Sequence, residues 1–180
     1  MSNRACLFAE DTPTPYNPSA DGSQSGANTV WVAGAAYQIP AFWLYCFDKA
    51  NLAVVVSEGD TIPALVSEMA PVSSRLAERE AVAKEVFPAY GRAWDEFRRA
   101  VEAADRKYLK LDACEIFMLY KGNEFGRLLE KALNWFGSRR ETDLDALLSL
   151  AGIDHYNGRT KSFSAGEYDS EMYLYGWLGV

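Results

Sequence analysis

The stretch YQIPAFWLYCF, residues 37–47, holds five aromatic residues and a cysteine and carries no charge. A soluble chain buries such a segment, so the other elements have to pack around it. Pro40 suits the first turn of a helix. The apolar positions after it recur at spacings of three and four, which indicates a short buried helix: Phe42, Trp43, Cys46 and Phe47. A small-molecule pocket beside residues 37–47 is the alternative interpretation.

Three segments near this stretch predict strands. Residues 3–9 are apolar on both sides, which is typical of a covered strand. Residues 29–37 open with β-branched and aromatic residues and can pair with the first strand. Residues 52–59 contain consecutive valines, which favour a strand over a helix. Between the first two strands, residues 10–28 hold three prolines among Ser, Asn and Asp, so we expect a long surface loop there.

Helical patterns occupy much of the remaining chain. We expect one helix to be capped at residues 60–61, with Pro63 in its first turn. Residues 73–87 are amphipathic, Pro88 interrupts them, and helical spacing resumes over residues 90–108. The chain therefore predicts a pair of surface helices joined at a proline.

The segment KYLKLDACEIFMLY changes from a period of two to a compact apolar run. This change predicts a strand that leads into a short helix, with Asp112 as its cap and Glu115 at the third position. Two further helices follow, one from Asn123 to Gly137 and one from Thr142 to Gly152. The glycine-rich and aromatic tail predicts one or two short strands.

These elements predict a helix-rich α+β fold with a small antiparallel sheet, built from the N-terminal strands, residues 52–58 and the C-terminal tail. A chain of 180 residues with 49% hydrophobic and 24% charged residues is typical of one folded domain, here residues 1–180. The formal net charge is −7, and the basic residues are dispersed. Such a surface disfavours direct nucleic-acid binding and suits a basic protein partner.

Cysteine usage and hydropathy indicate a cytoplasmic protein without a membrane role. Cys6, Cys46 and Cys114 lie far apart without the spacing of a zinc site or a disulfide framework, so we expect reduced structural thiols and no metal or cofactor. No uncharged apolar run approaches the roughly 20 residues that span a bilayer. The first residues also lack the pattern of a secretory signal.

The residue types that most catalytic sites need are scarce in this chain. His155 is the single histidine and lies in a turn after Gly152, without an identifiable partner. Asp112 and Glu115 share a helix face, and Glu124 lies one turn into the next helix. Capping accounts for the first two. We therefore expect a protein that is not an enzyme.

Aromatic residues are the one clear excess, at 13%. Trp43, Trp94 and Trp135 lie on predicted buried helix faces, whereas Tyr16 and Trp31 lie in or beside a loop. Tyrosine and tryptophan beside acids are typical anchors of protein interfaces, with packing within the tail as the alternative. The candidate partner-binding residues are Tyr156, Glu167, Tyr168, Asp169, Glu171, Tyr173, Tyr175 and Trp177.

The segments NRACLF, YQIPAFW and YLKLDACEIFMLY resemble small uncharacterised bacterial cytosolic proteins that begin Met, any residue, Asn-Arg. In size, acidity and aromatic content such proteins are similar to immunity proteins of interbacterial toxin systems. One superfamily of those has its proline-containing helix start near the amino end, followed by an Asn-Gly turn. Here a strand and a long loop precede that start, and DKAN follows it.

Three functional hypotheses follow. The first is a bacterial immunity protein that neutralises a basic toxin or effector domain by occluding its active site. The second is a small-molecule-binding protein or hydrolase-type enzyme with a pocket near residues 37–47 and the carboxylates of Asp112 and Glu115. The third is a structural subunit of a larger assembly.

Overall fold

The computed structural model describes residues 3–17, 28–57, 59–153, 156–163 and 169–179. Its centre is a six-stranded antiparallel sheet in the order β3-β4-β5-β1-β2-β6. The strands are β1 Arg4–Glu10, β2 Val30–Ala36, β3 Leu52–Ser57, β4 Asp60–Glu68, β5 Tyr108–Asp112 and β6 Trp177–Leu178. The predicted helix-rich α+β fold with an antiparallel sheet is confirmed.

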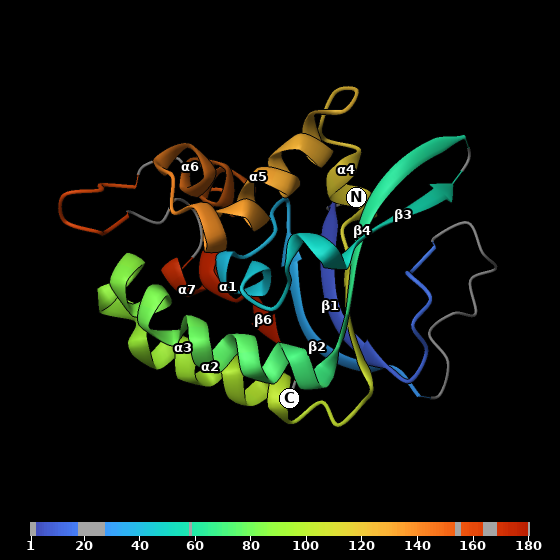
Figure 1. The fold of residues 1–180 in the computed structure, drawn as a ribbon, viewed down its shortest axis with the longest axis horizontal. Coiled ribbons are helices and arrows are strands. Elements are labelled where there is room, and N and C mark those ends of the chain that lie inside the picture. The colour runs from blue at the N-terminus through green and yellow to red at the C-terminus, as the bar shows by residue number, and fades with distance from the viewer. Residues whose placement is uncertain (1–2, 18–27, 58, 154–155, 164–168, 180) are drawn as a thin grey trace.

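Helices gather on one side of the sheet, and the chain that follows β1 runs over the other side (Figure 1). The helices are α1 Ala41–Leu44, α2 Met69–Val86, α3 Gly91–Glu102, α4 Cys114–Phe117, α5 Glu124–Ser138, α6 Glu141–Leu150 and α7 Ser170–Leu174. Short 3-10 turns at Lys49–Asn51 and Pro88–Tyr90 join neighbouring elements. Helices therefore pack on one face of the sheet, and among the described residues no helical layer covers the other face.

Alternation along β1 separates these two faces. Ala5, Leu7 and Ala9 are fully buried and belong to the core shared with the helices. Cys6 and Phe8 lie between them and point to the opposite face, as successive residues of a strand do. The two-sided apolar pattern of residues 3–9 thus reflects two different environments, a helix-packed core and an open face.

Most of the uncharged stretch 37–47 lies in the helix-packed core, whereas Tyr37 at its start is exposed. Residues 39–47 are buried, and α1 begins after Pro40. Phe42 contacts Tyr45, Phe87 and Trp94 edge-on, with ring centroids 6.0, 5.8 and 5.1 Å away. The predicted short buried helix is confirmed.

Two arginines of α2 hold the end of this stretch in place. Arg79 donates to the carbonyls of Tyr45 and Phe47 at 2.9 and 2.7 Å and pairs with Asp48. Arg75 also pairs with Asp48 and donates to the Cys46 carbonyl at 3.1 Å. Both side chains are largely buried, so the carbonyls that α1 leaves unpaired are satisfied inside the core.

The helix predicted to start at residues 60–61 is wrong, because the segment forms strand β4. Its burial alternates along the strand, and it forms a hairpin with β3. Pro63 pairs with Val54, whereas the ladder with β5 begins only at Leu65. A proline without an N–H is tolerated where one side of a strand lacks a partner, so its presence did not require a helix.

Other predicted boundaries shift by a few residues. The helix expected over 73–87 begins earlier, at Met69, and the one capped by Thr142 begins at Glu141. The helix expected to close at Gly137 continues to Ser138. Asn123 stands at the predicted N-cap of that helix but makes no side-chain cap bond. Propensity alone does not locate these ends, because tertiary contacts also decide them.

The tail contains a helix that the sequence pattern did not indicate. Helix α7 covers Ser170–Leu174, and the Asp169 side chain accepts a hydrogen bond from the Glu171 backbone N–H at its start. The expected short strand follows as β6 and pairs with β2. Asp169 and Glu171 therefore stand at a helix N-terminus, where carboxylates are stabilised.

Candidate functional site

The face of the sheet without a helical layer carries two half-exposed tryptophans. A β-bulge in β2 aligns Trp31 with Phe8, so the indole joins Cys6 and Phe8 on the open face. Trp177 of β6 stands opposite Gly34 of β2 in the antiparallel pairing of these strands. Trp31 is 46% exposed and Trp177 is 50% exposed. Two large aromatic side chains therefore stand at the surface where β2 and β6 meet.

Glycines allow this arrangement. Trp31 lies across Gly34, where an added Cβ would stand 2.7 Å from the indole Cζ2 atom. An added Cβ at Gly179 would lie 2.2 Å from Cδ1 of the same indole. Larger residues at either position would displace Trp31, so these glycines position the ring that forms the surface.

Trp31 lines two hollows of this face. One, of about 270 Å³, lies between Trp31 and Trp177 with Gly34 in its lining and Arg4 at its wall. The other, of about 160 Å³, lies toward β1 and β5. Its lining residues are Cys6, Phe8, Glu10, Tyr16, Thr29, Trp31 and Asp112. Tyr16 lies in the chain after β1, and its ring packs edge-on against Phe8, with ring centroids 5.8 Å apart. Ligand sites for whole small molecules are usually larger than either hollow.

A buried ion pair lies under the second hollow. Lys110 Nζ stands 2.6 Å from Glu10 Oε2, and the lysine side chain is 3% exposed. Burial alone would raise the pKa of Glu10, but hydrogen bonds from Lys110 and Thr29 outweigh it and lower that pKa. Glu10 is thus an ionised, internally neutralised carboxylate.

Asp112 and Glu115 stand in different surroundings. Burial raises the pKa of Asp112, and the nearby charge of Glu115 raises it further. Asp112 Oδ1 accepts a hydrogen bond from the Cys114 backbone N–H at 3.0 Å, but Asp112 ends β5 and the N-cap of α4 is Ala113, so the prediction of Asp112 as the cap is wrong by one residue. Glu115 does not complete a capping box, because its carboxylate accepts the Arg4 backbone N–H at 2.8 Å. The two predicted carboxylates lie beside the open face, away from residues 37–47.

The thiols near Asp112 are poor nucleophiles. Burial, together with the charges of Asp112 and Glu115, raises the pKa of Cys6 to about 12. The same causes raise the pKa of Cys114, and burial raises that of Cys46. Thiolates are the reactive form, so at neutral pH these three residues are protonated thiols. Within the described ranges, no three His, Cys, Asp or Glu residues are placed to hold a metal ion.

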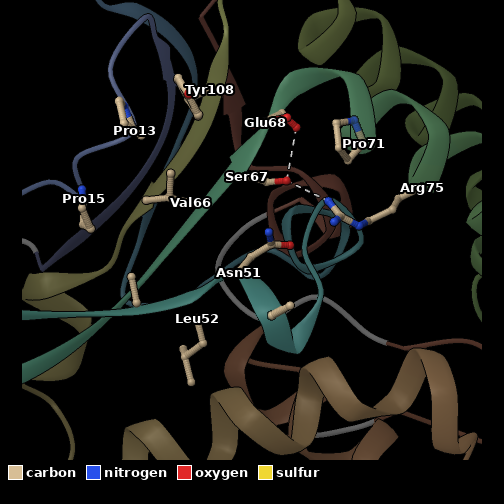
Figure 2. Close-up of a pocket in the computed structure, with 12 residues that line it drawn as sticks. Pro13, Pro15, Asn51, Leu52, Val66, Ser67, Glu68, Pro71, Arg75 and Tyr108 are labelled. Carbon is tan, nitrogen blue, oxygen red and sulfur yellow. Dashed lines mark hydrogen bonds between the residues drawn. The ribbon is translucent and has the colours of Figure 1, made fainter.

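A separate groove of about 480 Å³ runs along the edge of β4 (Figure 2). Strand β3 pairs with β4 only as far as Leu65, so the segment from Val66 to Glu68 has β5 on one side and this groove on the other. Figure 2 shows Pro13 and Pro15 on one side of the groove and Pro71 and Arg75 on the other. Ser67 lies between them.

The polar side chains in this groove are engaged with one another. Arg75 donates to Ser67 Oγ at 2.8 Å (Figure 2). Arg75 also pairs with Asp48. Ser67 Oγ in turn donates to the Glu68 carbonyl at 3.2 Å. A ligand in the groove would therefore meet a concave surface and a short open edge of β4. The Arg75 side chain is already bonded to Ser67 and Asp48.

The predicted tail residues do not form one surface. The hydroxyl of Tyr156 donates to the Val86 carbonyl at 2.7 Å, and Tyr173 packs against Phe163. Tyr175 is buried, and its hydroxyl donates to Glu171 at 2.8 Å. Among the predicted residues that the structure describes, Trp177 lies on the open face, Asp169 caps the N-terminus of α7 and Glu171 lies in its first turn. Glu167, Tyr168 and His155 lie outside the described residues.

The open face includes residues that the sequence pattern did not single out. Phe8 and Cys6 were expected in a covered strand, and their neighbours in space come from β2 and β5. Tyr16 and Trp31 were recognisable as aromatic residues in or beside the loop 10–28. Residues 11–17 of that loop contain no helix or strand, as expected, and residues 18–27 lie outside the described part.

Comparison with protein-family models, with curated proteins and with solved structures finds no match for this chain. Across the described residues, the helices are too short or too polar to traverse a bilayer.

Proposed function

We propose that this chain is a protein-binding protein that docks a basic partner domain on the open face of its sheet. The observation that carries this proposal is the pair of half-exposed tryptophans, Trp31 and Trp177, on the face opposite the helices. Tryptophan is enriched among the residues that dominate binding energy at protein interfaces. A formal net charge of −7 favours encounter with a positively charged partner.

In its most concrete form, the proposal is a bacterial immunity protein that neutralises a toxin or effector domain by covering its active site. The size, acidity and aromatic content that resemble such proteins support it. The protonated state of the thiols also supports a binding role over cysteine-based catalysis. A sheet face backed by a dense helical core would present the tryptophans with little reorganisation, which lowers the entropic cost of binding.

Co-expression with the product of the adjacent upstream gene tests this proposal. We expect the two proteins to co-purify and the wild-type chain to protect cells from that product's toxicity. Trp31→Ala and Trp177→Ala should weaken both effects. Val56→Ala is the matched control, because Val56 is 67% exposed on β3 at the other edge of the sheet. Absence of a complex together with absence of protection would refute the immunity function.

The groove along β4 favours a second candidate, a protein that binds a small molecule or an extended peptide there. Its volume of about 480 Å³ falls in the range of small-molecule sites. This groove is not the pocket expected beside residues 37–47, because residues 39–47 are buried and none of that stretch lines the groove. Ala53→Phe would fill the groove and separates the candidates. Partner binding that survives Ala53→Phe and is lost with Trp31→Ala favours the open face, and the reverse favours the groove.

A further inference from the structure

The smaller hollow of the open face combines aromatic walls with a carboxyl group that lacks a cationic partner. Phe8, Tyr16 and Trp31 supply the aromatic lining, and Asp112 supplies the carboxyl. The other acid of the lining, Glu10, is already neutralised by Lys110 at 2.6 Å. Within the described residues, no lysine or arginine forms an ion pair with Asp112, whose carboxyl group is hydrogen-bonded to the backbone and side chain of Cys114.

We propose that this hollow receives the guanidinium group of an arginine side chain from the partner protein. The inference rests on the proposed function, because it names the partner chemistry that the open face recognises. The arginine would pair with Asp112 and lie against Trp31.

The charges around the hollow favour a cation over a neutral or anionic group. Asp112 and Glu115 are close enough for the charge of one to raise the pKa of the other. The pKa of Tyr16 is raised by burial and then by Asp112, Cys114, Cys6 and Glu115. At neutral pH the thiols and Tyr16 are protonated and carry no charge, so the negative charge here comes from the carboxyl groups of Asp112 and Glu115. An incoming cation would relieve the repulsion between these two carboxylates. An incoming anion would increase it.

The shape of the hollow favours a single side chain, and among cationic side chains it favours arginine. A volume of about 160 Å³ is below that of pockets for whole small molecules. Guanidinium is planar, pairs with carboxylates through two hydrogen bonds and stacks on aromatic rings. Lysine offers a strongly hydrated point charge that gains less from aromatic walls. Cation–π contact is strongest with tryptophan, which Trp31 provides.

A titration with N-acetyl-arginine-methylamide tests the inference without the partner protein. We expect the arginine compound to shift the Trp31 indole N–H and the Asp112 carboxyl resonances in NMR spectra, with little change at the Trp177 indole. N-acetyl-citrulline-methylamide has nearly the same shape without the charge and should leave these signals unchanged. Equal shifts from both compounds, or no shift from the arginine compound, would overturn the inference.

Asp112→Asn is the decisive variant, because asparagine keeps an oxygen for the Cys114 N–H and removes the charge. We expect the arginine response to fall at least tenfold while the rest of the spectrum remains that of the folded protein. An unchanged response in Asp112→Asn would show that the arginine compound binds at another site.

Once the partner has been identified, its binding to Asp112→Asn distinguishes this inference from the proposed function. If Trp31→Ala abolishes partner binding and Asp112→Asn changes it less than twofold, the open face binds its partner and the arginine inference is wrong. If neither variant weakens the complex, the proposed function fails as well. A tenfold or greater loss with Asp112→Asn, in parallel with the loss of the arginine response, supports both.

Discussion

The two faces of the sheet use one set of strands for different purposes. On the helix side, β1 contributes Ala5, Leu7 and Ala9, which are fully buried among other apolar residues. On the open side, the same strand contributes Cys6, Phe8 and Glu10, which line a hollow with polar and aromatic neighbours. The helix side therefore contributes most of the stability, whereas the open side exposes groups that a partner can contact.

Of the substitutions that test the difference between the two faces, Phe42→Ala should lower the stability of the protein most. The Phe42 ring lies among Tyr45, Phe87 and Trp94 and is almost fully buried. Phe42→Ala should lower the free energy of unfolding by about 4 kcal/mol, as phenylalanine deletions in packed cores do. Urea denaturation measures this. A loss below about 1 kcal/mol would show that the stretch 37–47 is not part of a tight core.

The arginine anchor of α1 gives the next largest effect. Arg79→Ala removes a buried guanidinium that serves two carbonyls and Asp48. We expect a loss of about 3 kcal/mol, because the carbonyls and the carboxylate are left without their donor. Arg79→Lys keeps the charge but cannot reach all three acceptors, so its loss should be intermediate. Equal stabilities of wild type and Arg79→Ala would contradict the anchoring role.

Substitutions on the open face should cost much less stability. Trp31 and Trp177 are half-exposed, so each change to alanine should lower the free energy of unfolding by about 1 to 2 kcal/mol. Urea denaturation of the two tryptophan variants beside Phe42→Ala measures these differences in the free energy of unfolding. If either tryptophan variant were as unstable as Phe42→Ala, the open face would be a structural element and the contrast between the faces would disappear.

The smallest expected effect concerns the pH dependence of Asp112. Its folded-state pKa is raised by burial, so the folded protein holds this proton to a higher pH than the unfolded chain does. The carboxyl therefore disfavours folding progressively as pH rises from the unfolded pKa through the folded one. Asp112→Asn should match the wild type in acid and be more stable at neutral pH, with the difference appearing across that interval.

Denaturation of both proteins over a series of pH values checks this prediction. The charged and titratable neighbours that share the surroundings of Asp112 are Cys6, Cys114, Glu115, Tyr16 and Arg4. Glu115→Gln is the control, because it removes one cause of the shift and should reduce the pH-dependent difference. A variant Asp112→Asn that is less stable than wild type at neutral pH would contradict the burial effect.

Much of the fold was predictable because hydrophobic periodicity is local. The strands at residues 3–9, 29–37 and 52–59 and the helix after Pro40 all carry their pattern within a few residues. The segment with Pro63 misled the prediction, because its proline suits both a first helical turn and a strand with one open side. Which of these applies depends on β5, some 40 residues away along the chain.

The candidate site was predictable only in part. Trp31, Trp177 and Tyr16 were recognisable as aromatic residues outside helical patterns, and Asp112 as a carboxylate near a helix start. Their meeting on one face depends on the pairing of β1 with β2 and β5 and on the bulge in β2. Pairing register at this distance is not encoded in local spacing. The tail tyrosines were equally aromatic, yet Tyr175 turned inward and bonded to Glu171.

Calorimetric titration of the upstream gene product with wild type, Trp31→Ala, Trp177→Ala and Val56→Ala tests the central claim most directly. We expect each tryptophan change to weaken binding by about 30-fold or more, since interface tryptophans often contribute 2 kcal/mol or more. Val56→Ala should bind as wild type does. Wild-type affinity in both tryptophan variants, with all proteins folded, would contradict the assignment of binding to the open face.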